Sequence, residues 1–145
     1  MTEIKIGGRT VPLLYTTFEM IAIQKEIGCT AFQLKDEVFG IHLEDEDDPS
    51  SLRVEVATDG ERTEKLCKMI RILGNAGLEE KGEEPNLTDK WIMRNMKPAM
   101  IVPYCVTVMA EIAEGNKMES PKEAEKGAEV DEGLEEQMAK KLPGN

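Results

Sequence analysis

Few residues in this chain have the types and spacing that catalysis requires. The single histidine, His42, lies in the sequence Gly40-Ile41-His42-Leu43, just before a run of acidic residues. A catalytic histidine needs a nucleophile or a carboxylate that the fold brings to it, and a solvated loop histidine is the simpler interpretation. The chain has no G-x-S-x-G, H-E-x-x-H or P-loop motif. We therefore expect a protein that is not an enzyme and that uses no cofactor.

The three cysteines, Cys29, Cys67 and Cys105, are odd in number, 38 residues apart, and form no C-x-x-C pair. This spacing predicts neither a disulfide framework nor a structural zinc site, and free thiols fit a reducing cytosol. Lys68 would lower the pKa of the Cys67 thiol if that thiol were exposed. Cys105 stands among apolar residues, so we expect it to be an inert core thiol.

The acidic run Glu44–Asp48 suggests a calcium site as an alternative function. Carboxylates at alternating positions would come from Glu44, Glu46 and Asp48, with Glu55 in the twelfth position. An EF-hand loop, however, starts with aspartate and has glycine in sixth place for its sharp turn, where this chain has a proline. A solvated acidic loop is the favoured interpretation, and a small calcium-binding module is kept as the alternative.

Composition and charge narrow the class of partner. The 145 residues include 29 acidic and 18 basic side chains, a net charge of −11. Nucleic acid and anionic membranes carry dense negative charge and are therefore poor partners. No basic segment followed by a long apolar run marks a signal peptide, and the longest nearly apolar stretch, Ala99–Met109, is well short of the roughly 20 residues of a membrane span. We expect a soluble intracellular protein that binds other proteins.

Turn and cap residues predict the elements of the N-terminal half. Apolar residues alternate with charged ones on either side of a Gly-Gly turn, which predicts a hairpin over Glu3–Leu13. Helices are expected over Phe18–Ile27 and from Thr30 to about Val38, each with a threonine cap and a terminating glycine. A short strand over Leu52–Val56 is expected within an acidic loop excursion, residues 44–60.

Three helices are predicted in the C-terminal half. The first leads from Thr63 towards Gly82 and follows the i, i+3, i+4, i+7 apolar pattern, with two glycines that are expected to weaken its second half. The next is capped by Thr88 and stopped by Pro98. The last begins at Pro98 or Pro103 and continues to about Glu114. Because it is apolar almost all round, we expect it to be the most buried helix.

These elements predict a mainly helical α+β fold, with a small N-terminal β-hairpin packed on a bundle of four or five helices. Residues 1–118 are expected to form one folded domain. Residues 119–145 contain eight acidic and four basic side chains and no aromatic residue. Such a segment cannot bury enough apolar area to offset its conformational entropy, so a disordered acidic tail is predicted.

Methionine is unusually frequent, with nine residues against three phenylalanines. Thioether side chains repack at little cost, which suits a surface for partners that vary or slide, although core filling is the simpler interpretation of any single methionine. Together with the apolar last helix, they predict an apolar face for self-association into small oligomers or for a client protein. The residues expected on this face are Met93, Met96, Met100, Ile101 and Tyr104.

The order of these elements resembles that of the tail assembly chaperones of long-tailed bacteriophages and prophages, especially those of Gram-positive hosts. The resemblance covers residues 3–118 and rests on order and pattern. It is carried by the hairpin Ile4-Lys5-Ile6-Gly7-Gly8-Arg9-Thr10-Val11-Pro12-Leu13, the helix start Thr17-Phe18-Glu19-Met20, the Leu66–Leu73 helix, the sequence Glu84-Pro85-Asn86-Leu87-Thr88-Asp89-Lys90-Trp91, and the apolar last helix with its charged tail.

The resemblance implies a role without catalysis in the cytoplasm of the bacterial host. Such chaperones bind the tape-measure protein, and often the tail-tube subunit, during tail assembly, and leave before the virion is complete. They commonly exist in two lengths, the longer made by a translational frameshift. The apolar face would cover the exposed stripes of the client, while the acidic loop and tail keep the complex soluble. A structural or adaptor protein that is retained in the virion tail is a second alternative.

Overall fold

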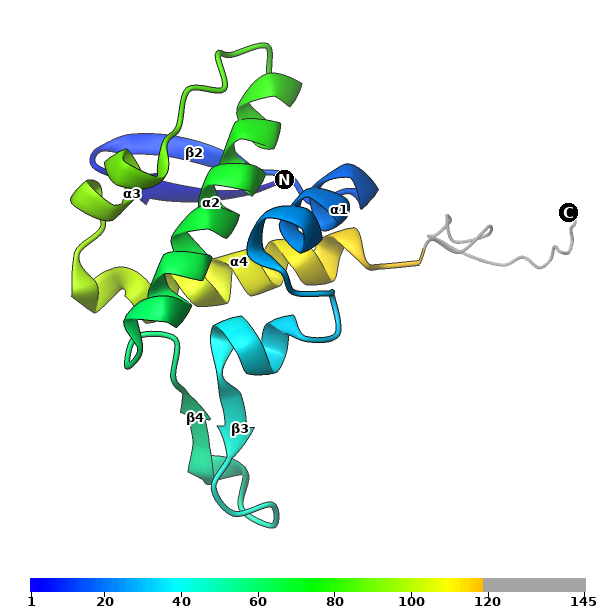
Figure 1. Cartoon of the computed structure of the whole chain (residues 1–145), viewed down its shortest axis with the longest axis vertical. Helices are drawn as coiled ribbons and strands as arrows, with labels where there is room; N and C mark the ends of the chain where they lie inside the picture. Colours follow the sequence, from blue (N-terminus) through cyan, green and yellow to red (C-terminus); the bar gives the residue numbers. More distant parts are fainter. Residues whose placement is uncertain (119–145) are drawn as a thin grey trace, which may run out of the picture. The chain divides into compact units, whose positions relative to one another are not determined.

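The computed structural model describes residues 1–118, and the predicted disordered tail, residues 119–145, lies outside the described residues. Residues Met1–Gly115 form one compact unit. Within residues 1–118 the chain forms two two-stranded sheets and four α-helices, with α2 at the centre of the helices (Figure 1). The predicted fold class, mainly helical α+β with a small N-terminal hairpin, is confirmed.

The N-terminal hairpin pairs β1 (Thr2–Ile6) with β2 (Arg9–Leu13) in antiparallel register, with Ile4 opposite Val11. Gly7 and Gly8 form the two-residue turn with φ angles of 56° and 79°, a conformation that residues with a Cβ rarely adopt. The alternating apolar side chains of both strands are buried, so one face of the hairpin belongs to the core.

The first helix, α1 (Thr17–Ile27), begins and ends where its cap residues predict. Thr16 is the N-cap, and its backbone N–H donates to Glu19 Oε1 at 2.9 Å. Gly28 ends the helix in the left-handed region, with φ of 86°.

The second predicted helix, from Thr30 to Val38, is mostly replaced by a turn and a short π-helical segment, η1 (Lys35–Phe39). A π turn spans five residues instead of four, so it brings residues i and i+5 to the same side. Leu34 and Phe39 are thereby buried together with Val38. The regular helix predicted here was wrong: residues five positions apart diverge around an α-helix, whereas the wider π turn places Leu34 and Phe39 on the same buried side.

Part of the predicted acidic excursion, residues 44–60, is a second hairpin. Strands β3 (Ile41–Leu43) and β4 (Leu52–Val54) pair antiparallel, and the connecting loop contains the 3₁₀ turn η2 (Pro49–Ser51). The hairpin extends away from the helices (Figure 1). Strand β3 was not predicted, because a single apolar–polar–apolar alternation over three residues is too short to indicate a strand.

Helix α2 (Gly60–Glu80) starts three residues before the predicted Thr63. Asp59 is the N-cap, and its side chain accepts a hydrogen bond from Glu61 N at 3.0 Å. Nine of the residues of α2 are buried, so α2 and not the last helix is the most buried helix.

Gly74 and Gly77, in the second half of α2, allow close packing instead of merely weakening the helix. A Cβ on Gly77 would lie 2.1 Å from the carbonyl oxygen of Pro12, and one on Gly74 would lie 2.6 Å from the Leu87 side chain. Real Cβ atoms essentially never approach other atoms so closely. Gly77 therefore lets α2 lie directly on the backbone of strand β2, and Gly74 leaves room for the side chains of Leu87 and Val11.

Two further helices complete the unit. Helix α3 (Asp89–Asn95) is capped by Thr88, whose hydroxyl accepts a hydrogen bond from Trp91 N at 3.1 Å. A 3₁₀ turn, η3 (Pro98–Met100), leads into α4 (Ile101–Gly115). Helix α4 buries one side only, against β1 and α2. The prediction that it is the most buried helix was wrong, because only five of its residues are buried: Ile101, Tyr104, Cys105, Val108 and Glu111.

Glu111 is a buried carboxylate, with 3% of its surface exposed. Its Oε1 accepts hydrogen bonds from Thr2 N at 2.9 Å and from Thr2 Oγ1 at 2.8 Å, and its Oε2 accepts one from Tyr15 N at 3.2 Å. These three bonds tie α4 to the first strand and to the connection between β2 and α1.

An ion-pair cluster centred on Asp89 joins α1, α2 and α3. Asp89 Oδ2 lies 3.0 Å from Lys68 Nζ, Asp89 Oδ1 lies 2.6 Å from Arg71 Nε, and Arg71 also pairs with Glu26. Partial burial alone would raise the pKa of Asp89, but hydrogen bonds and charge from Arg71 and Lys68 outweigh it and hold the pKa below its usual 3.8.

Asp89→Asn is expected to lower the free energy of unfolding at pH 7 by about 1–3 kcal/mol, because it weakens charge-assisted hydrogen bonds. A carboxylate with a depressed pKa stabilises the fold fully above its unfolded pKa of about 3.9, and this contribution is lost as the pH falls through the folded pKa. Urea unfolding at pH 7 and at pH 3 should therefore show a difference that shrinks in acid. The exposed control Asp47→Asn should change neither value, and an undiminished Asp89→Asn effect at pH 3 would contradict the assignment.

Candidate functional site

An open groove of about 570 Å³ lies beside the first turns of α2, and its volume falls in the range of ordinary ligand pockets. We call it the α2–α3 groove. It is formed by the β4–α2 connection, the start of α2 and one side chain of α3: Ala57, Thr58, Asp59, Gly60, Thr63, Glu64, Cys67 and Met93.

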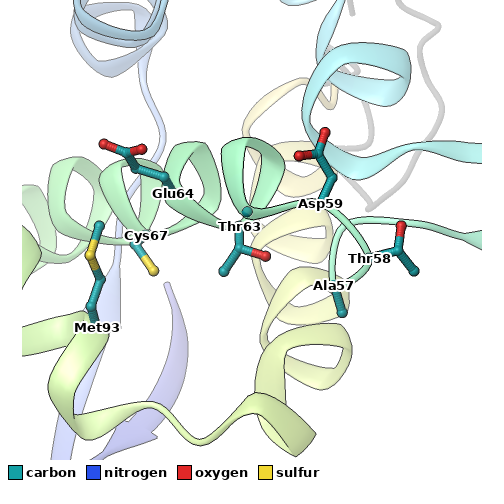
Figure 2. A pocket seen from close by; sticks show the side chains of 8 residues that line it. Ala57, Thr58, Asp59, Thr63, Glu64, Cys67 and Met93 are labelled. Atoms are coloured by element: carbon teal, nitrogen blue, oxygen red, sulfur yellow. The ribbon is translucent and has the colours of Figure 1, made fainter.

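The two sides of the α2–α3 groove differ in character. Figure 2 shows the side chains of Thr63, Cys67 and Met93 on one side of α2, while the carboxylates of Asp59 and Glu64 point to the other. These carboxylates already have cationic neighbours on α2, at 3.8 Å for Asp59 and 4.0 Å for Glu64. The groove therefore offers mainly apolar contact, and Met93 is the large apolar side chain of its lining that is exposed, at 41%.

Local hydrogen bonds hold the walls of the α2–α3 groove in place. Thr63 Oγ1 donates to the carbonyl oxygen of Val56 at 2.8 Å, which fixes the loop before α2 against its first turn. Thr88 caps α3 and so sets the direction of the short helix that carries Met93. Asp89, the first residue of that helix, is bound to α2 by Lys68 and Arg71.

The thiol in this groove is unsuited to nucleophilic chemistry. Burial, helped by the negative charges of Asp89 and Glu64, raises the pKa of Cys67 from 9.0 to about 11. Burial likewise raises the pKa of Cys105 to about 12, and the predicted core position of Cys105 is confirmed. Cys29 is also buried. The condition under which Lys68 would activate Cys67, an exposed thiol, is not met.

Native-state thiol labelling should be slow at all three cysteines. For Cys67 a pKa of about 11 in place of 9.0 lowers the thiolate fraction at neutral pH about a hundredfold, before any effect of burial on access. We expect an aromatic disulfide reagent at pH 7.4 to label three thiols rapidly in urea and none on the same time scale in buffer. One thiol reacting at the unfolded rate in buffer would contradict this picture.

The structure separates the five residues predicted to form an apolar face. Met93 and Met100 are on the surface, with 41% and 38% of their areas exposed. Met96, Ile101 and Tyr104 are buried in the core, so the expected continuous face is not formed. Ile101 and Tyr104 lie on the side of α4 that packs inward, and the Tyr104 hydroxyl donates to the backbone oxygen of Lys5.

Exposed apolar side chains that sequence reasoning missed lie on other helices. Phe18 and Ile21 on α1 and Val106 on α4 are all exposed. Apolar residues spread around most of α1 were the available signal, because a helix in a small domain cannot bury every side. The surplus apolar surface is therefore distributed over several elements.

The candidate calcium ligands are not brought together. Glu44 pairs with Arg53 at 3.0 Å, and Glu55 lies 3.5 Å from His42. Asp48 caps the η2 turn and accepts hydrogen bonds from Ser50. Within residues 1–118, no group of three or more His, Cys, Asp or Glu side chains is arranged to hold a metal ion.

Comparison of the chain with family models, with curated proteins and with solved structures gives no match. Among residues 1–118, no single helix has both the length and the apolar composition needed to cross a membrane. The segments 89–95 and 98–115 meet these two requirements only when taken together, and the chain bends by 101° between them.

Proposed function

We propose that this chain is a tail assembly chaperone of a long-tailed bacteriophage or prophage. It acts in the host cytoplasm by binding the tape-measure protein, and also tail-tube subunits, without catalysis. The observation that supports the proposal best is the exposed apolar side chain of Met93 in the α2–α3 groove, with Met100 also exposed near the start of α4.

The physical demands of such a role agree with these surfaces. A client with apolar helical stripes needs a chaperone with apolar surface of its own, and flexible methionines adapt to successive stretches of a repetitive client. Among residues 1–118, ten large hydrophobic side chains expose 38% or more of their area. The same residues carry 21 acidic and 14 basic side chains, a net charge of −7 that opposes aggregation of the loaded complex.

The order of elements on which the resemblance rests is also the order in the structure. The N-terminal hairpin is followed by α1, by the central α2, by the short Trp91-containing α3 and by α4. This agreement supports the proposal at the level of the fold, and the partner must be tested directly.

Co-expression with the tape-measure protein encoded nearby, followed by affinity purification, tests the proposal. The wild-type chain should co-purify with the tape-measure protein. Met93→Asp, which places a charge in the groove, should reduce recovery of the complex about tenfold or more. Met118→Asp is the matched control because Met118 is 95% exposed and is not one of the residues that line the groove, and it should leave recovery unchanged. Absence of any wild-type complex would count against the chaperone role.

Mass spectrometry of purified virions separates a chaperone from a retained structural protein. A chaperone should be absent from mature particles although abundant in infected or induced cells. Stoichiometric presence in the virion would instead favour the structural or adaptor function. Sedimentation equilibrium of the purified chain would show in addition whether it self-associates.

A further inference from the structure

A second groove lies between α1 and the C-terminal half of α2. We call it the α1–α2 groove. It has a volume of about 390 Å³, and it is lined by Leu14, Thr16, Phe18, Glu19, Ala76, Glu79 and Glu80. These residues come from the start of α1, from the segment before it and from the last turns of α2. Gly60 and Thr63, by contrast, place the α2–α3 groove at the other end of the same helix.

The apolar wall of the α1–α2 groove is unusually open. Phe18 is 78% exposed, and Ile21, one turn further along α1, is 45% exposed. Residues at i and i+3 lie on neighbouring positions of a helix surface, so the two side chains extend one apolar strip along α1. Burying that strip against another chain would remove apolar surface from water and so stabilise the complex.

The acidic wall of the α1–α2 groove is formed by two carboxylates at the C-terminal end of α2, where negative charge is unfavourable. Glu79 and Glu80 are the last residues of α2, and the last turn contains no basic residue. A helix C-terminus carries partial negative charge, so carboxylates there are destabilising and cations are stabilising. The placement weakens α2, which suggests that these side chains are kept for a contact outside the fold.

Within residues 1–118, neither Glu79 nor Glu80 has a cationic partner. The neighbouring Lys81 pairs with Glu3 at 3.2 Å. The third carboxylate of the groove, Glu19, is occupied as the partner of Thr16 in the α1 cap. The α2–α3 groove differs in this respect, because its carboxylates already lie beside Arg62 and Lys68.

We propose that the α1–α2 groove binds an amphipathic helix of another protein that carries lysine or arginine next to its apolar residues. An apolar side chain of that helix packs against Phe18 and Ile21. Its cation meets Glu79 and Glu80 and, through them, the negative end of α2. Charge complementarity selects a basic helix over an acidic one, and the inference does not depend on the tail-assembly role.

Fluorescence anisotropy with designed peptides tests the proposal on the full chain. One labelled peptide has leucine at i, i+3, i+4 and i+7 and lysine at flanking positions, which makes an amphipathic helix, and its counterpart has glutamate at every lysine position. We expect the leucine–lysine peptide to bind in a salt-sensitive manner and the glutamate peptide to bind about tenfold more weakly or less. Equal affinity for the two peptides would overturn the charge assignment.

Two matched pairs of variants locate the binding site. Phe18→Ala should weaken binding of the leucine–lysine peptide about tenfold, whereas Phe32→Ala, which removes a phenylalanine that is 96% exposed elsewhere, should not. The double variant Glu79→Gln/Glu80→Gln should weaken binding and reduce its salt dependence. The double variant Glu46→Gln/Asp47→Asn removes the same charge from the acidic loop and should leave binding unchanged.

The stability of the Glu79→Gln/Glu80→Gln variant gives an independent check. Its Tm should equal or exceed that of the wild type, because two carboxylates are removed from a helix C-terminus. A lower affinity then reflects lost contact and not unfolding. If Phe32→Ala or the acidic-loop variant weakened peptide binding as much as the groove variants do, the interaction would be a non-specific attraction. That result would overturn the proposal. The proposal would also be overturned if the leucine–lysine peptide did not bind and the wild type were a dimer that Phe18→Ala dissociates. The α1–α2 groove would then be occupied by a second copy of this chain.

Discussion

Replacing Gly77 by alanine is expected to lower the free energy of unfolding by about 3 kcal/mol, and an uncompensated clash would prevent folding altogether. The new Cβ would lie 2.1 Å from the carbonyl oxygen and 2.5 Å from the carbonyl carbon of Pro12. Both are backbone atoms of a paired strand, so they cannot move aside as the end of a flexible side chain does. The helix-propensity gain of about 1 kcal/mol for glycine to alanine is too small to offset this.

Gly60→Ala is the matched control for Gly77→Ala. It makes the same substitution in the same helix, but apart from the chain neighbours and the backbone of the helix itself no atom lies within 4 Å of the new Cβ. Urea unfolding should show no loss of stability for Gly60→Ala and a large loss for Gly77→Ala. If the two variants were equally stable, the close approach of α2 to β2 would be incorrect.

Glu111→Ala is the second substitution with a large expected effect, about 2–4 kcal/mol of lost stability. It leaves Thr2 N, Thr2 Oγ1 and Tyr15 N without their acceptor at the end of α4. A buried donor that loses its partner costs about 1–3 kcal/mol, although Thr2 is only half-buried and part of its loss is recovered by water. Glu111→Gln should fall between the wild type and Glu111→Ala, because one oxygen can still accept.

Hydrogen exchange of individual amides gives a more specific readout for Glu111 than global unfolding. The amides of Thr2 and Tyr15 should lose protection in Glu111→Ala before the rest of the hairpin does. Glu46→Ala, in the exposed acidic loop, should change neither stability nor exchange. Unchanged protection of both amides in Glu111→Ala would show that the carboxylate does not hold the N-terminal strand.

Local signals allowed much of the fold to be predicted. The Gly7-Gly8 turn, the Thr16 cap and the Gly28 stop each determine backbone conformation within a few residues. The corresponding hairpin and α1 were therefore located from the sequence to within one or two residues. The start of α2 was missed because Asp59-Gly60 is equally typical of a turn and of an N-cap.

Contacts between distant segments could not be predicted in the same way. The bond from Glu111 to Thr2 spans 109 positions, and the Gly77–Pro12 approach spans 65. No local pattern distinguishes a glutamate that accepts buried hydrogen bonds from one that faces water. Likewise, a glycine required for close packing has the same local signature as one that only weakens a helix.

The candidate partner surface was predicted in part. Met93 does line a groove, because α3 is short and buries only Ile92. Ile101 and Tyr104 were assigned to the surface because α4 is apolar all round, which conceals the inward i, i+3, i+4, i+7 stripe. Phe18 was not assigned to a partner surface, because apolar residues surround most of α1 and do not show which side is exposed. Which carboxylates lie beside a cation is visible only in three dimensions.

The Glu111 contact also has a consequence for biosynthesis. The first strand cannot acquire its permanent anchor until residue 111 has left the ribosome, which at about 5–20 residues per second takes several seconds after Thr2 is made. During that interval the hairpin exists without its contacts to α4. Truncated nascent chains that stop before α4 should therefore be sensitive to protease, and release of the last helix should convert them to a resistant form in one cooperative step.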